Sequence, residues 1–318
     1  MWKPIHLVPP NTRINFMRNH KITFAISVIL VLSSFGLLFT KGLNFGIDFA
    51  GGILMEVRAP QQPDLGDMRS RLGGLGLGEV SLQAFGTDND VLIRLPQQEG
   101  GEEAQQTAIS KVKAELGDKW DYRRTETVGP KVGSELVKNA VIAAGLAMLG
   151  IFGYVWIRYD WQFGLNALLA MFHDVITTLG LFSLLGLQFD LATVAAILTV
   201  AGYSVNDTVV IFDRIRYEMR RYKTMEMSDL INLSINETLS RTTVTSGLTL
   251  ISVIALFLFG GEVLRGFAVA LIWGIVVGTY STICVASPLL LYANLRQSKI
   301  RGGAEGAKAS GKGVTRGA

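Results

Sequence analysis

The sequence predicts an α-helical membrane protein with six transmembrane helices and a small α+β domain between the first two. The chain of 318 residues is 49% hydrophobic but only 18% charged, whereas soluble domains are about 25% charged. Its apolar residues gather in six long runs, and one long polar segment separates the first run from the others. With a net charge of only +4, this composition excludes a disordered chain, a collagen-like chain and a strongly basic nucleic-acid binder.

The first predicted span is 22–40, a stretch of 19 residues without a charged side chain. Residues 1–21 carry four basic and no acidic residues, and we expect them to form a cytoplasmic tail. A cleaved signal peptide has an apolar stretch of about 7–15 residues and a small-residue cleavage site. The stretch here is longer and lacks such a site, so we expect it to remain as a membrane anchor.

Residues 41–137 are predicted to form a water-soluble periplasmic domain, because they hold 15 acidic and 11 basic residues. Strand-like alternation and helical spacing follow one another in the order β-α-β-β-α-β, which is the ferredoxin-like pattern. The expected strands are 53–58, 79–85, 91–95 and 120–128, and the expected helices are 64–72 and 102–116. This fold serves many functions, so it indicates none by itself.

Five further apolar runs are long enough to cross a bilayer, which takes a helix of about 20 residues. They are 139–157, 163–185, 191–212, 242–260 and 267–291. Residues 213–241 are predicted to form a cytoplasmic loop of short amphipathic helices lying at the membrane surface. Residues 292–318 are basic and poor in apolar side chains, which predicts a disordered cytoplasmic tail.

The distribution of lysine and arginine predicts the orientation, because both are enriched on the cytoplasmic side of membrane proteins. With six spans, the two tails and the 213–241 loop lie on one side. The N-terminal tail carries 4 basic residues, the loop 6 and the C-terminal tail 6. The acidic domain lies on the opposite side. We therefore expect both termini in the cytoplasm and the soluble domain outside.

The residues most informative about function are the ionisable groups in these spans. A charged side chain at the centre of a membrane helix costs about 2.5–3.5 kcal/mol on insertion scales, and such groups usually mark an ion path. His173 and Asp174 are predicted near the middle of the bilayer. Asn206 and Asp207 lie one to two turns from the cytoplasmic end of the fourth span. Arg241 begins the fifth span.

A proton relay is one interpretation of these groups. Burial raises the pKa of a carboxyl group and a nearby arginine lowers it, so movement of Arg241 toward and away from Asp207 would release and bind a proton. A polar stripe follows Arg241 at helical spacing and consists of Thr245, Thr249 and Ser252. Structural alternatives remain open: snorkelling for Arg241, hydrogen bonding for Asp207, and a structural polar pair for His173 and Asp174.

The sequence contains no pattern for an enzyme, a metal centre or a cofactor site. The one cysteine, Cys284, cannot form an internal disulfide or a cysteine-based metal cage. The glycine-rich run 73–78 contains G-x-G-x-G, but a predicted helix precedes it and a strand follows, the reverse of what a dinucleotide fingerprint needs. We therefore expect a protein that transports rather than catalyses.

Seven short segments carry a more specific signal: FGIDFAGG at 45–52, VGPKVG at 128–133, HDV at 173–175, GYSVNDT at 202–208, FDRIR at 212–216, RT at 241–242 and TSG at 245–247. Together they resemble the motifs of the SecF family of bacterial protein-export subunits, within the SecD/SecF group of RND-type transporters. The resemblance extends over about residues 10–295. The two tails carry none of it.

The resemblance implies a motor that assists protein export in the bacterial inner membrane. SecF proteins pair with SecD as a heterodimer, and the two six-span halves resemble one twelve-span transporter. The pair uses the proton motive force to draw secreted proteins out of the SecYEG channel after SecA has pushed them in. Further implied partners are YajC, the translocating preprotein and membrane lipid, but no nucleic acid.

The motifs also imply roles for individual residues. Asp207 and Arg241 match the proton-relay pair of the family. Asn206, Asp174 and His173 lie in the same or a neighbouring motif, and we assign them to the same relay. A six-span half would leave a polar face on spans three to five uncovered, so we expect the chain to be unstable or inactive without its partner.

Two other functions remain open. Half of an RND-type small-molecule or lipid exporter would share the charges in the membrane, but its outer domain would need a ligand pocket. A structural scaffold without ion passage would tolerate the replacement of Asp207 and Arg241.

Overall fold

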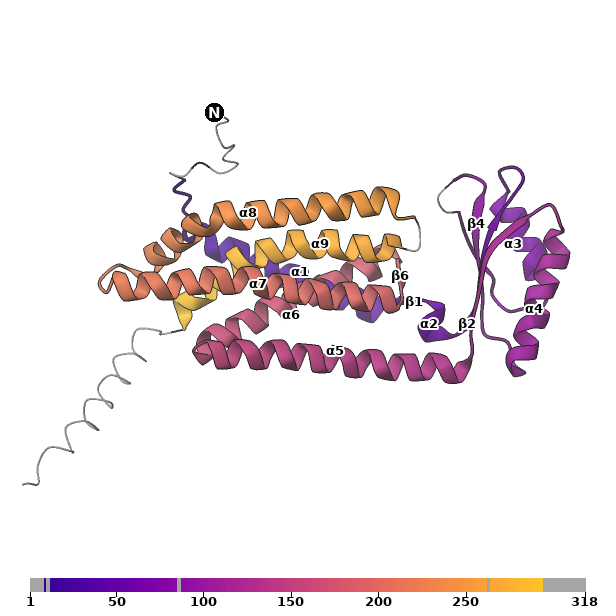
Figure 1. Cartoon of the computed structure of the whole chain (residues 1–318), viewed down its shortest axis with the longest axis horizontal. Coiled ribbons are helices and arrows are strands. Elements are labelled where there is room, and N and C mark those ends of the chain that lie inside the picture. Colours follow the sequence, from indigo (N-terminus) through magenta and orange to yellow (C-terminus); the bar gives the residue numbers. More distant parts are fainter. Residues whose placement is uncertain (1–8, 10–11, 85–86, 262–263, 294–318) are drawn as a thin grey trace, which may run out of the picture.

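The computed structural model describes residues 9, 12–84, 87–261 and 264–293. Within them, six long apolar helices form a bundle, and a small domain of strands and helices stands at one end of it (Figure 1). The predicted fold class is confirmed. Residues 1–8 of the predicted N-terminal tail and 294–318 of the predicted C-terminal tail lie outside the described residues.

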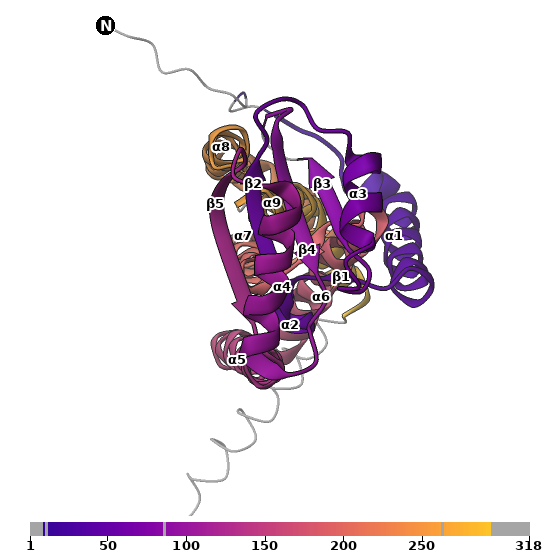
Figure 2. The ribbon, with the colours of Figure 1, turned by 90° about the vertical axis from the view of Figure 1, so that its right-hand side faces the viewer.

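The sheet domain (residues 52–128) is a four-stranded antiparallel sheet with two helices on one face (Figure 2). Its elements are β2 (Gly52–Arg58), α3 (Leu65–Gly73), β3 (Ser81–Ala84), β4 (Asp90–Leu95), α4 (Gly101–Leu116) and β5 (Asp121–Val128). The strands stand in the order β3-β4-β2-β5, which is the ferredoxin-like topology.

Alternation along the strands decides which face of the sheet is covered. Ile53, Met55 and Val57 of β2 are fully buried in one apolar core with α3 and α4, as a side-chain period of two requires. Leu54 and Glu56 point to the opposite face and line a cavity of about 440 Å³ beside the end of the helix bundle. The sheet domain therefore turns its helices outward and its open face toward the bundle (Figure 1).

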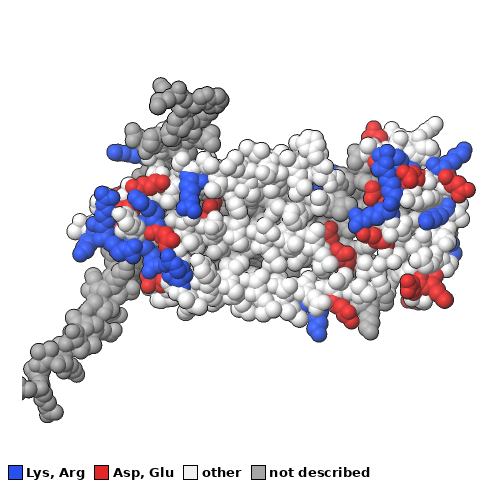
Figure 3. Space-filling view, viewed as in Figure 1, with Lys and Arg blue, Asp and Glu red and all other residues white. Residues whose placement is uncertain are grey.

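The bundle has a surface suited to a bilayer. Its long helices are α1 (His20–Thr40), α5 (Pro130–Arg158), α6 (Trp161–Leu185), α7 (Leu191–Arg221), α8 (Met227–Phe259) and α9 (Arg265–Ser281). A π-helical turn (Thr282–Ala286), α10 (Ser287–Leu289) and a 3₁₀ turn (Leu290–Tyr292) continue α9. Figure 3 shows charged residues gathered at the two ends of the molecule, with a broad uncharged surface between them.

Three of the six helices form the interior. In α6, α7 and the α9 segment, 50–56% of the most apolar stretch is buried, whereas in α1, α5 and α8 this share is 17% or less. The outer three helices expose large apolar side chains such as Ile29, Leu146 and Leu248. Lipid or another protein must cover them.

The structure differs from the prediction for residues 213–241. Instead of short helices at a membrane surface, α7 continues to Arg221 and α8 already begins at Met227. The apolar side chains that suggested surface helices, such as Ile215, Leu230 and Ile235, are fully buried in one core. An amphipathic period shows that a helix has an apolar face, but not whether lipid or a second helix covers that face.

The described end of the predicted N-terminal tail is attached to α8. Asn236 Oδ1 accepts the Ile14 N–H at 2.9 Å, and its Nδ2 donates to the Ile14 carbonyl at 2.9 Å. One turn earlier, Asn232 Oδ1 accepts the Met17 N–H at 3.0 Å. These bonds fix the entry into α1 at the end of α8 that lies farthest from the sheet domain (Figure 1).

A short joint connects the sheet domain to the start of α7. It consists of β1 (Asn44–Phe45), α2 (Ile47–Ala50) and β6 (Gln188–Phe189), with β1 and β6 paired in parallel. Asp48 caps α7 by accepting the Leu191 N–H at 3.0 Å, and Asp190 caps it by accepting the Thr193 N–H at 2.7 Å. Carboxylates are favourable at a helix N-terminus, so the FGIDFAGG segment holds the beginning of α7 in place.

Gly274 allows α9 to approach α7, and its replacement should destabilise the bundle. An added Cβ would lie 2.1 Å from Cγ2 of Val200, which is 1% exposed and has no room to move. We expect Gly274→Ala to lower the free energy of unfolding by about 1–3 kcal/mol, the usual cost of overpacking. Thermal unfolding in detergent measures this. Gly145→Ala on α5, where a Cβ meets nothing within 4 Å, is the control, and equal stability of the two variants would contradict the packing.

Candidate functional site

Polar side chains lie in the interior of the bundle, on α6, α7, α8 and α9. A buried polar group that is cut off from water needs a partner within the protein. Two carboxyl groups organise these side chains into two neighbouring clusters. We name them the Asp174 cluster (His173, Asp174, Ser204 and Ser281) and the Asp207 cluster (Tyr203, Asp207, Ser246 and Thr279).

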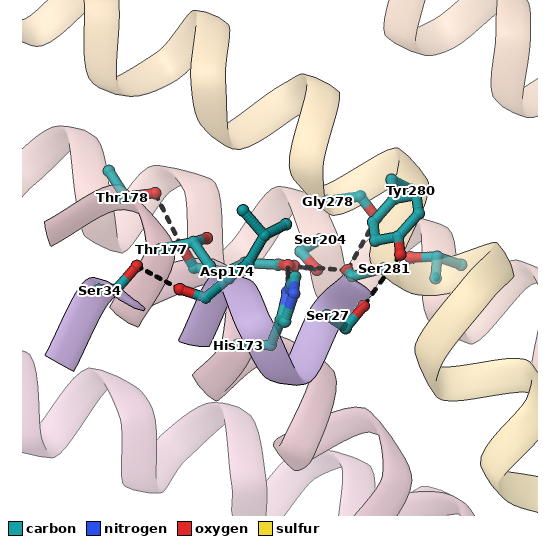
Figure 4. Close-up of polar contacts among 12 residues, drawn as sticks. Ser27, Ser34, His173, Asp174, Thr177, Thr178, Ser204, Gly278, Tyr280 and Ser281 are labelled. Carbon is teal, nitrogen blue, oxygen red and sulfur yellow. Dashed lines mark hydrogen bonds and ion pairs between the residues drawn. The ribbon is translucent and has the colours of Figure 1, made fainter. Parts of the chain in front are cut away.

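Asp174 of α6 is fully buried and joins three helices (Figure 4). Its Oδ2 accepts the hydroxyl of Ser204 on α7 at 2.5 Å and the hydroxyl of Ser281 on α9 at 2.8 Å. Its Oδ1 accepts Nδ1–H of His173 at 2.9 Å. Three donors match the chemistry of a carboxylate, which only accepts hydrogen bonds. Asp174 is therefore a firmly held centre between α6, α7 and α9.

His173 has one ring nitrogen engaged and one free. Nδ1 is the engaged nitrogen, because it lies 2.9 Å from Asp174 Oδ1. Nε2 is buried and has no hydrogen-bond partner among the described residues. The ring centroid lies 6.4 Å from that of Tyr280 on α9, whose hydroxyl is 3.0 Å from Ser27 Oγ on α1. His173 therefore contacts the α1–α9 side of the bundle (Figure 4).

Asp207 of α7 is 3% exposed but is held less firmly than Asp174. Its Oδ2 lies 3.3 Å from the hydroxyl of Ser246 on α8. Ser246 also accepts the Tyr203 hydroxyl at 3.0 Å and lies 2.9 Å from the hydroxyl of Thr279 on α9. One long hydrogen bond compensates weakly for the burial of a carboxylate. Asp207 is thus the less firmly held of the two buried carboxyl groups.

The predicted site residues do not all come together. Arg241 on α8 and Asn206 on α7 are both exposed on the surface of the chain. Arg241 is near enough to interact electrostatically with Asp207, but no ion pair of 4.0 Å or less joins them in the described part of the chain. His173 and Asp174 belong to the neighbouring cluster. Of the five predicted residues, three are therefore buried inside the bundle and two are exposed on its surface. The buried ones are His173, Asp174 and Asp207, and the exposed ones are Asn206 and Arg241.

Sequence spacing does not identify the hydroxyl groups around Asp207. The predicted stripe of Thr245, Thr249 and Ser252 donates to carbonyl groups of α8 itself. The hydroxyl that faces Asp207 belongs to Ser246, the next residue after Thr245. The sequence does contain a pattern that could have identified Ser246. Thr242 and Ser246 are four residues apart and hence share one face of α8, and this face is buried in the structure.

Charged groups outside the spans connect the sheet domain to α7. Arg94 of β4 donates to Gln188 of β6. Burial lowers the pKa of Arg94, and the nearby Asp190 acts in the opposite direction. Asp48 and Asp190 line the cavity between the sheet face and the bundle. Within the described residues, no three His, Cys, Asp or Glu side chains are grouped so as to hold a metal ion.

Six apolar helices, a ferredoxin-like domain after the first of them and two buried carboxyl clusters define a multi-pass membrane protein with ionisable groups in its interior. Residues 108–296 match the family of the protein export membrane protein SecD/SecF, C-terminal, and residues 36–61 match the SecD/SecF GG motif. The chain belongs to the SecD/SecF family. The family predicted from the seven sequence motifs is thereby confirmed.

Individual relatives agree with this assignment. The chain is 46% identical to the protein translocase subunit SecF of Rickettsia felis, over 93% of this chain and 97% of that protein. It is 48% identical to the SecF subunit of Desulfurispirillum indicum, over 88% and 91%. The crystal structure of SecDF, a translocon-associated membrane protein from Thermus, superposes with a TM-score of 0.82 at 38% identity. That match covers 91% of this chain but only 39% of the SecDF chain.

Replacement of Asp174 should destabilise the bundle strongly. Asp174→Ala would leave Ser204, Ser281 and His173 without their acceptor, and each buried donor left unpaired costs about 1–3 kcal/mol. Some donors will find other partners, so we expect a total loss of about 2–4 kcal/mol in the free energy of unfolding. Asp174→Asn keeps one acceptor oxygen and should lose less. Thermal unfolding in detergent gives the order, and wild-type stability of Asp174→Ala would contradict the role of this cluster.

Proposed function

We propose that this chain is a subunit of the Sec protein-export machinery that works with SecD and uses the proton motive force to promote the late translocation and release of secreted proteins. Its family membership and the names of its relatives support the export role. The observation that carries the proton-driven part is the weakly held Asp207 carboxyl in the interior of six membrane-spanning helices.

In this mechanism Asp207 takes up and releases a proton. Arg241 stabilises the ionised carboxylate through its charge, and its approach or withdrawal changes the protonation equilibrium. A proton that crosses the whole membrane field gains about 2.3 kcal/mol per 100 mV, which can drive a conformational cycle without a cofactor. Asn206 lies beside Asp207 on the exposed side of α7. The His173–Asp174 pair holds the neighbouring part of the relay.

A polar strip on the bundle surface supports the need for a partner. Thr199, Gly202 and Asn206 are exposed on α7, and Arg241 and Thr245 are exposed on α8. Lipid would cover such groups poorly, whereas small and polar residues are typical of helix–helix contacts in membranes. We propose that SecD covers this strip as a heterodimer, and we expect the chain to lack stability or proton conduction without SecD. The SecDF chain of Thermus, of which this chain matches 39%, is long enough to contain such a second half.

The orientation completes the proposal. The chain lies in the bacterial inner membrane with both termini in the cytoplasm and the sheet domain in the periplasm, since most lysine and arginine residues outside the sheet domain lie in the two tails and in residues 213–241. There the sheet domain can meet the preprotein as it leaves SecYEG, after SecA has acted. YajC and membrane lipid are further partners.

A small-molecule or lipid exporter is a weaker candidate. Such a function needs an apolar ligand pocket in the sheet domain. A cavity of about 450 Å³ on its helical side is lined by Asp64, Asp67, Arg71 and Lys119, together with apolar residues. Charges at this density suit a solvated surface better than a lipid site.

Secretion of a model precursor should depend on the acidity of residue 207. In cells depleted of the wild-type protein, Asp207→Asn should lose nearly all stimulation of export, because the amide side chain of asparagine does not take up and release a proton near neutral pH. Asp207→Glu should restore part of it, since the carboxyl group returns at a shifted position. The measurement is the rate of precursor processing, at matched membrane levels and with SecD binding verified.

The matched control is Asp213→Asn, which removes a half-exposed carboxylate six residues farther along the same helix. It should export like wild type. Equal export by wild type, Asp207→Glu and Asp207→Asn would contradict the proton-driven mechanism and favour a scaffold without ion passage.

A further inference from the structure

We propose that the hydroxyl of Ser246 is a proton-dependent switch that couples the protonation of Asp207 to the contact between α8 and α9. Ser246 hydrogen-bonds the Asp207 carboxyl and also reaches Thr279 on α9. This inference deepens the proposed function and rests on it, because it requires that Asp207 bind and release a proton.

The hydrogen bonds around Ser246 leave one proton with two acceptors. Its hydroxyl oxygen has one proton to donate and two lone pairs. Tyr203 donates to it at 3.0 Å and occupies one lone pair. Thr279 donates its own proton to the Ile275 carbonyl at 2.8 Å, so Thr279 can only accept from Ser246, at 2.9 Å. Asp207 Oδ2, at 3.3 Å, competes for the same Ser246 proton.

The charge on Asp207 decides this competition. Hydrogen bonds to an ionised acceptor are roughly twice as strong as neutral ones. The Ser246 hydroxyl therefore donates its hydrogen bond to an ionised Asp207, and Thr279 loses its donor. A protonated Asp207 has a proton of its own, which the second lone pair of Ser246 accepts. The Ser246 proton then turns to Thr279. Protonation of Asp207 therefore reverses one hydrogen bond between α7 and α8 and forms one between α8 and α9.

The position of Thr279 allows α9 to transmit this change. Ser281, two residues farther along α9, donates to Asp174 at 2.8 Å. Thr282, which follows, begins the π-helical turn and lies 2.9 Å from Thr208 on α7. π-helical turns occur frequently at functional sites. Because α9 touches both carboxyl clusters within one turn, a bond gained or lost at Thr279 reaches the Asp174 cluster through the same helix.

The helices packed against α7 carry other titratable groups. They include Arg241 on α8, His173 and Asp174 on α6, Tyr280 on α9, Cys284 in the π-helical turn and Arg158 on α5. Arg241 acts on Asp207 through its charge, Asp174 is occupied by its own three donors, and Arg158 pairs with Asp213 at 3.7 Å. Among the described residues, Ser246 is the side chain that hydrogen-bonds the Asp207 carboxyl.

Infrared difference spectroscopy of the full chain, in membranes together with SecD, tests the switch. The signal is the C=O band of protonated Asp207, identified by its loss in Asp207→Asn, and the measured quantity is the pH at its midpoint. Ser246→Ala removes the donor to the ionised form, so the midpoint should rise by about one unit, a tenfold change in the protonation equilibrium. Thr279→Val removes the acceptor that favours the protonated form, so the midpoint should fall.

Two further variants complete the design. Ser246→Thr keeps a hydroxyl and should restore the wild-type midpoint. Ser252→Ala on the same helix removes a hydroxyl that, among the described residues, hydrogen-bonds the Leu248 carbonyl alone, at 3.1 Å, and it should leave the midpoint unchanged. If the Ser246→Ala variant does not assemble with SecD, the Thr279→Val variant alone decides whether the switch exists. A lower midpoint than in wild type supports the switch, and an unchanged midpoint overturns it.

The outcomes separate this inference from the proposed function. Opposite shifts in Ser246→Ala and Thr279→Val support the switch. A titrating band whose midpoint is the same in wild type, Ser246→Ala and Thr279→Val overturns the switch and leaves the proton relay standing. A wild-type protein without any titrating band that depends on Asp207 overturns the relay itself.

Discussion

The interior of the bundle depends on one constraint: a carboxyl group buried among membrane-spanning helices must receive its hydrogen bonds from the protein itself. Asp174 meets this constraint with three donors from two neighbouring helices and its own. Asp207 meets it with one long bond to Ser246. The helices come close enough to supply these donors because small residues line their contacts, as Gly278 does beside Asp174 and Ser204. The two buried carboxyl groups thus differ in how they are held: Asp174 joins three helices through three hydrogen bonds, whereas Asp207 is held by one long hydrogen bond.

The same helix links this interior to the sheet domain. The N-terminus of α7 is capped by Asp48 and Asp190 at the joint, and Asp207 lies roughly 24 Å farther along at 1.5 Å per residue. Arg94 of the sheet domain donates a hydrogen bond to Gln188 of β6, the strand that precedes α7. A displacement of α7 caused by protonation would therefore reach the sheet domain through short, directional contacts. The FGIDFAGG motif contributes Asp48 to these contacts.

Much of this architecture could be predicted from the sequence, and the exceptions have physical causes. The six spans and the β-α-β-β-α-β order follow from hydrophobic runs and periods, which local sequence determines. The arrangement of residues 213–241 could not be predicted in this way. The apolar residues of this segment, such as Ile215 and Leu230, would show the same helical spacing whether they faced lipid or packed against each other. At the site, Asp174 and Asp207 stand out because burial of a carboxyl group is costly. Ser246, Tyr203 and Thr279 do not, because hydroxyl groups are common in membrane helices and only the packing decides which one faces the acid.

Proton movement through the assembled protein tests the central role of Asp207 most directly. Vesicles containing the full chain with SecD, and a pH-sensitive dye inside, can be placed in an imposed pH gradient. Wild type and Asp213→Asn should change the internal pH at the same rate, while Asp207→Asn should be no faster than vesicles without protein. Equal proton flux through wild type and Asp207→Asn would contradict a relay that passes through this carboxyl group, and Asp207 would then have a structural role only.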